Sequence, residues 1–105
     1  MKIPKTIKVG ALTYTVNQDK ILADAKDCWG YITPYAQVIN LDPSQHIDRL
    51  PQSLLHELTH AAFKQGGLHH LIGEGDKLTE EMIVDGVSQH LYTIIKDNKL
   101  DFIND

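Results

Sequence analysis

Two histidines and a glutamate in the pattern H-E-x-x-H, at His56, Glu57 and His60, offer metal-binding chemistry. Residues four apart in an α-helix share one face and are separated by about 6 Å along the axis. Both imidazoles can therefore reach one Zn²⁺ ion, while Glu57 is angled away from the ion and can contact a water bound to it. The motif predicts a zinc site with Glu57 as the general base. In the alternative, two helix histidines simply flank a solvated glutamate.

A catalytic zinc needs a third protein ligand and keeps one position for water. Glu80 and Glu81 follow about twenty residues downstream, in the first turn of a second predicted helix. We expect Glu81 to be the ligand, because Asp85 lies four residues later on the same face and can orient a ligand histidine. The equivalent position after Glu80 is the apolar Val84. Glu80 stays an alternative ligand, and a solvated acidic face without metal stays open as well.

The remaining chemically useful residues have simpler explanations. His69 and His70 lie in the loop between the two helices, where one of them could stabilise an oxyanion, but surface positions in a polar loop are the preferred explanation. His90 is about 180° around its helix from Glu81. We interpret Trp29 and Cys28 as buried core residues and His46, His69 and His70 as surface residues. His90 is interpreted as a residue outside the site, and sheet packing is the preferred explanation for Tyr14, Tyr31, Tyr35 and Tyr92.

The two helices that carry the motif residues are predicted from their apolar periodicity. The first covers residues 52–65 and stops at Gly66 and Gly67; its apolar stripe is Leu54, Leu58, Ala61 and Ala62. The second is expected to be capped by Thr79 and to run to about Asp97. Its expected buried face is Ile83, Val87, Leu91 and Ile94.

A small sheet is predicted before these helices. Residues 6–16 indicate a hairpin that turns at Gly10, and residues 29–33 and 36–41 indicate two further strands. Residues 20–28 fit either a helical turn or an irregular connection. A short helix from Pro43 to Leu50, capped by Asp42 and followed by Pro51, is expected next. The fold class is therefore α+β: a small mixed or antiparallel sheet followed by the H-E-x-x-H helix and the glutamate-bearing helix.

Composition excludes several classes of protein. The 105 residues suit a single domain, 1–105, and the 42% hydrophobic and 23% charged residues are typical of an ordered globule. The net charge of −4 and the lack of a basic patch argue against nucleic-acid binding. We expect no membrane span and no secretory signal, and the single cysteine fits a cytoplasmic location.

The motif His56-Glu57-Leu58-Thr59-His60, with Glu81 and then Asp85, resembles the gluzincin zinc metallopeptidases. The order of elements over residues 29–97 is similar to minimal gluzincins and to phage or mobile-element proteins near the ImmA/IrrE type, which would place the protein in a host cytoplasm. The resemblance implies a zincin-like metallopeptidase domain in which residues 36–41 form the edge strand beside the cleft, where a peptide adds as a further strand. The chain departs from larger gluzincins because no second lobe follows the glutamate helix.

These observations predict a zinc-dependent peptidase in which His56, His60 and Glu81 hold Zn²⁺ and Glu57 activates the metal-bound water. The expected partner is a peptide or protein substrate, and the oligomeric state is left open. A first alternative is a non-catalytic zincin-fold binding or regulatory module with a structural zinc site. A second is a metal-free interaction protein with an accidental motif.

Overall fold

The computed structural model describes residues 3–68, 71 and 77–98. Two strands, β1 (Thr6–Val9) and β2 (Leu12–Asn17), form an antiparallel hairpin. Gly10 has a φ of +61° in the turn between them, a backbone conformation that favours glycine. The predicted hairpin and its turning residue are therefore confirmed.

A short helix and two strands complete the sheet. Helix α1 (Lys20–Lys26) fills the region that the sequence left ambiguous. Asp19 caps it, because its Oδ1 accepts a hydrogen bond from the Leu22 backbone N–H at 3.0 Å. Strand β3 (Gly30–Thr33) leads through the 3₁₀ turn Pro34–Ala36 into β4 (Val38–Leu41).

The strands are ordered β1-β2-β4-β3 in one mixed sheet. β4 pairs in parallel with β2 and antiparallel with β3, so β4 is an interior strand. The prediction that residues 36–41 form the edge strand is therefore wrong, and β3 occupies that edge. A connection through α1 allows β4 to insert between β2 and β3, an order that periodicity along the chain does not encode.

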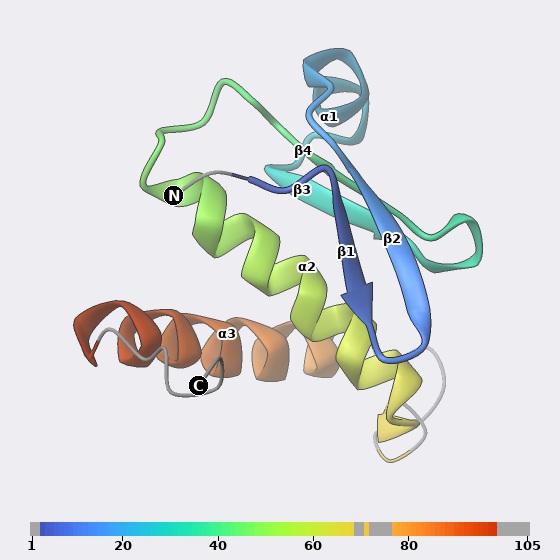
Figure 1. The fold of residues 1–105 in the computed structure, drawn as a ribbon, viewed down its shortest axis with the longest axis vertical. Coiled ribbons are helices and arrows are strands. Elements are labelled where there is room, and N and C mark those ends of the chain that lie inside the picture. Colours follow the sequence, from blue (N-terminus) through green and yellow to red (C-terminus); the bar gives the residue numbers. More distant parts are fainter. Residues whose placement is uncertain (1–2, 69–70, 72–76, 99–105) are drawn as a thin grey trace.

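The long helices stack on the sheet in two layers. Helix α2 (Arg49–Gln65) packs on one face of the sheet, and α3 (Lys77–Asn98) packs on α2 (Figure 1). The core lies between the sheet and α2 and consists of Tyr14, Val16, Ile39, Leu41, Leu54 and Ala61. The α+β class is therefore confirmed. None of the helices in the described part of the chain has the length and apolar character needed to cross a membrane.

The short helix expected from Pro43 to Leu50 does not form. Residues 42–48 form turns instead, because Asp42 Oδ1 accepts hydrogen bonds from the Ser44 backbone N–H at 2.8 Å and from its hydroxyl at 2.7 Å. Helix α2 begins at Arg49, which puts Pro51 in its first turn. Proline is tolerated there because the first-turn N–H groups have no intrahelical acceptor.

The buried face of α3 differs from the predicted one by one position. Val84 is fully buried and Ser88 is 3% exposed, whereas the four predicted residues, Ile83, Val87, Leu91 and Ile94, are 38–47% exposed. On α2, Leu54 and Ala61 are buried as predicted, but Ala62 is exposed and Phe63 is buried. Thr79 lies inside α3, two residues after its start, and is not the residue before it.

Candidate metal centre

Helix α2 presents His56 and His60 side by side. The residues are four apart, and their ring centroids are 4.9 Å from each other. The helix is continuous from Arg49, and its buried face against the sheet fixes its rotation. Both histidine side chains are therefore turned toward α3 and largely buried, with exposed fractions of 20% and 13%.

Helix α3 brings Glu81 between the two imidazoles. Its Oε1 lies 2.5 Å from His60 Nε2, and its Oε2 lies 3.4 Å from His56 Nε2. Ligand atoms of the three residues all fall within 4.8 Å of one another. Two imidazole nitrogens and a carboxylate oxygen converging in this way form a donor set that suits a divalent metal such as zinc.

The outer nitrogen of each histidine also faces a carboxylate. His56 Nδ1 lies 2.9 Å from Asp85 Oδ1, and His60 Nδ1 lies 2.8 Å from Glu80 Oε2. The two helices cross so that His60, the later histidine on α2, meets Glu80, the earlier acid on α3, and His56 meets Asp85. Such carboxylates fix the tautomer and orientation of imidazoles that bind metals.

The sequence analysis missed the contact of Glu80 with His60. Glu80 lies four and eight residues before the buried Val84 and Ser88, and therefore on the face of α3 that packs on α2. From the sequence, Glu80 is not the preferred ligand, because Val84, four residues later, cannot orient a histidine. Glu80 itself lies at His60 Nδ1 as an orienting carboxylate, a role that depends on how α3 packs on α2 and that spacing within α3 alone does not reveal.

Glu57 lies beside this group without joining it. Its Oε2 is 4.0 Å from His56 Nε2, and the residue is only 6% exposed. Burial raises the pKa of its carboxyl, while the neighbouring charges of His56 and His60 act in the opposite direction. Gly30 of β3 is its neighbour on the sheet side, since a Cβ built on Gly30 would lie 3.7 Å from Glu57 Cγ. A protonatable group of this kind next to a metal site fits a general base.

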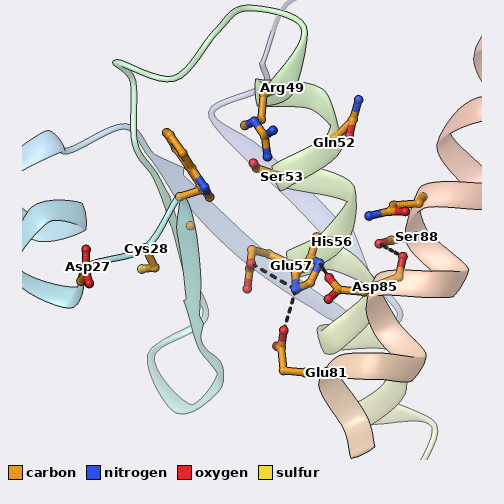
Figure 2. A pocket seen from close by; sticks show the side chains of 13 residues that line it. Asp27, Cys28, Arg49, Gln52, Ser53, His56, Glu57, Glu81, Asp85 and Ser88 are labelled. Carbon is orange, nitrogen blue, oxygen red and sulfur yellow. Dashed lines mark hydrogen bonds and ion pairs between the residues drawn. The ribbon is translucent and has the colours of Figure 1, made fainter. Parts of the chain in front are cut away.

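A cleft of about 380 Å³ runs between β3, α2 and α3, and His56, Glu57, Glu81 and Asp85 line it (Figure 2). Cys28 lines the same cleft on the sheet side, and burial raises its thiol pKa. The cysteine is not part of the group of converging ligand atoms. The interpretation of Trp29 as a core residue is wrong, because its side chain lines the cleft and is 53% exposed.

Two of the other histidines, His90 and His46, make contacts elsewhere, and two more fall outside the described residues. His90 Nδ1–H donates to the Gly86 carbonyl within α3 at 2.7 Å. His46 lies before α2, where its Nδ1 is 3.6 Å from an oxygen of the exposed Asp48. His69 and His70 fall outside the described residues.

Comparisons with protein-family models, with curated proteins and with solved structures found no match.

Proposed function

We propose that the protein is a zinc-dependent peptidase in which His56, His60 and Glu81 hold the metal and Glu57 is the general base. The observation that carries the proposal is the convergence of three ligand atoms within 4.8 Å, from two helices, beside a buried glutamate. The carboxylates at the Nδ1 atoms of both histidines support the same proposal, since metal-binding histidines are typically oriented by such carboxylates.

Zinc, when bound, polarises a carbonyl and lowers the pKa of water toward 7. The residues of the chain have the complementary tasks. Asp85 and Glu80 accept hydrogen bonds from the Nδ1–H groups, which keeps the Nε2 lone pairs available for a metal ion. Glu57 accepts a proton from the attacking water and returns it to the leaving amine.

The outer edge of β3, which pairs with no strand among the described residues, is the proposed binding position for a peptide substrate. The Asp42 N–H donates to the Trp29 carbonyl, and hydrogen-bonded pairs alternate along an antiparallel ladder. The backbone groups of Gly30 and Ile32 therefore face away from β4. Because Gly30 also lies next to Glu57, a peptide added at this edge would pass beside the base.

The gluzincin resemblance is retained within this proposal, as is a cytoplasmic location, which the free Cys28 supports. The alternative is a binding or regulatory module in which the metal only joins α2 to α3. The cleft beside Glu57 favours the peptidase, because it leaves the candidate ligands accessible to a substrate, whereas a structural zinc is normally enclosed by four protein ligands.

Cleavage of a broad peptide library by zinc-loaded protein tests the proposal. We expect cleavage by the wild type, and a loss of about 10²–10⁴-fold in Glu57→Gln, because general-base assistance is worth that much. Mass spectrometry of the products reads the cut sites, and elemental analysis verifies that the variant keeps its zinc. A wild type that binds zinc and cuts nothing would favour the module, and equal rates in the two proteins would place the activity elsewhere.

A further inference from the structure

The cleft extends along α2 well beyond the histidines. Arg49 lines its far end, seven residues before His56. Seven residues in an α-helix correspond to about 10.5 Å along the axis and nearly two full turns, so both residues lie on one face. Figure 2 shows Arg49, Ser53 and His56 following one another along this side of α2.

The guanidinium of Arg49 is oriented but not neutralised. It lies 5.2 Å from the ring centroid of Trp29, a distance typical of a cation–π contact. Among residues 3–68, 71 and 77–98, no carboxylate forms an ion pair with it. This contact holds the guanidinium over the ring without using its N–H donors, and their fork matches a carboxylate in two parallel hydrogen bonds.

Arg49 also differs in charge from the rest of the cleft. The acidic residues that line it are Asp27, Glu57, Glu81 and Asp85, and Arg49 is the single lysine or arginine among the described lining residues. A substrate carboxylate would therefore be repelled along the cleft wall and attracted at the Arg49 end. This uneven distribution of charge can select both the substrate and its direction of binding.

We propose that Arg49, held against Trp29, is a specificity-determining residue that binds a carboxylate of the substrate peptide. The inference rests on the proposed peptidase function and names the substrate class. An extended chain advances about 3.3 Å per residue, so the 10.5 Å separation places this carboxylate about three residues from the cleaved bond. The carboxylate belongs to an acidic side chain or to the end of the peptide chain.

Paired peptides test this inference. Each pair is identical except for Glu or Gln at one position, and further pairs end in a free carboxylate or an amide. Binding is measured on zinc-loaded Glu57→Gln, which should not cut them, through the fluorescence of Trp29, the single tryptophan of the chain. Anisotropy of labelled peptides gives a second reading. The expected result is about fivefold tighter binding of one carboxylate peptide, the size typical of an exposed ion pair.

Two variants in the same background assign the preference to Arg49. Arg49→Gln should bind the carboxylate and neutral peptides equally. Lys26→Gln is the matched control, because Lys26 lies over the Tyr31 ring at the same 5.2 Å but does not line the cleft. It should keep the preference. Raising the salt concentration should weaken the preference of the unsubstituted protein.

Absence of binding, equal affinities for both members of every pair, or a preference that survives Arg49→Gln would overturn the inference. The proposed function is judged separately, by cleavage with the wild type. A carboxylate preference without cleavage would keep the binding site and reject the peptidase. Cleavage without a preference would keep the peptidase and reject the role of Arg49.

Discussion

Each ring nitrogen of His56 and His60 faces a carboxylate oxygen. Glu81 lies between the two Nε2 atoms, and Asp85 and Glu80 lie at the two Nδ1 atoms. A histidine on the solvated surface of a helix does not need a carboxylate at each of its two ring nitrogens. The arrangement therefore indicates that the imidazoles are held in one orientation, which is what a metal site requires.

Neutralising the carboxylates at the Nδ1 atoms should weaken metal binding without abolishing it. Asp85→Asn and Glu80→Gln are each expected to lower zinc affinity about 10- to 100-fold, because a neutral amide oxygen orients the imidazole more weakly than a carboxylate does. Competition with a zinc chelator gives the affinities. Asp97→Asn, at the exposed end of the same helix, is the control and should match the wild type. Unchanged affinity in both site variants would contradict the assigned roles.

The buried carboxyl of Glu57 should make the metal-free protein sensitive to pH. Its pKa is raised in the folded state, so between the ordinary value of 4.5 and the raised value the unfolded chain ionises while the folded chain keeps its proton. The free energy of unfolding must fall as pH rises through this window. Glu57→Gln has no such proton, and should be more stable than the wild type above the window and similar to it below.

Urea unfolding of both metal-free proteins between pH 4 and pH 8, with a chelator present, measures this difference. A constant difference across the whole range would contradict the raised pKa. The sequence predicted the place of Glu57 from its position one residue after a candidate ligand. It could not predict the burial, because the neighbours of Glu57 include Gly30, which belongs to a separate strand distant in sequence.

For helix α3, the periodicity of apolar residues did not predict which face of the helix is buried. Its apolar residues at Ile83, Val87 and Leu91 have the spacing of a buried face, yet they are 38–46% exposed. The side toward α2 carries Val84 and the acids that meet the histidines. Helix existence and length follow from local sequence, whereas helix rotation depends on contacts with another element.

Two neighbouring substitutions in α3 measure this rotation. Val84→Ala should lower the free energy of unfolding by about 2 kcal/mol, because it removes two buried carbon atoms and leaves a cavity. Ile83→Ala removes more carbon atoms from a position that is 38% exposed, and should cost about 1 kcal/mol or less. Denaturant unfolding compares them. A larger loss for Ile83→Ala would support the rotation expected from periodicity.

At the scale of the whole molecule, the sheet and α2 share one small core, and the described packing of α3 is on α2. The α+β class and the order of the strands and the two long helices along the chain could be predicted, because they depend on local patterns of apolar and turn-forming residues. The insertion of β4 between β2 and β3 could not, because it joins segments distant in sequence. The same holds for the cleft and for the exposure of Trp29.

Zinc should stabilise the fold as a whole, because the residues proposed to hold it come from both α2 and α3. The melting temperature should rise with zinc concentration, as expected for a ligand that binds the folded state. The increase should disappear in mildly acidic buffer, since protons compete with the metal for the imidazole nitrogens. Thermal unfolding followed by circular dichroism measures both effects. A melting temperature independent of zinc at neutral pH would contradict a site shared by the two helices.

The central claim is that His56, His60 and Glu81 together bind one metal ion, and zinc stoichiometry tests it most directly. Purified chain is saturated with zinc, dialysed and analysed for metal, beside Glu81→Ala and Glu80→Ala. The account predicts one zinc per chain in the wild type, little or none in Glu81→Ala, and retained but weaker binding in Glu80→Ala. A wild type that takes up no zinc, or a Glu81→Ala variant that holds as much as the wild type, would contradict it.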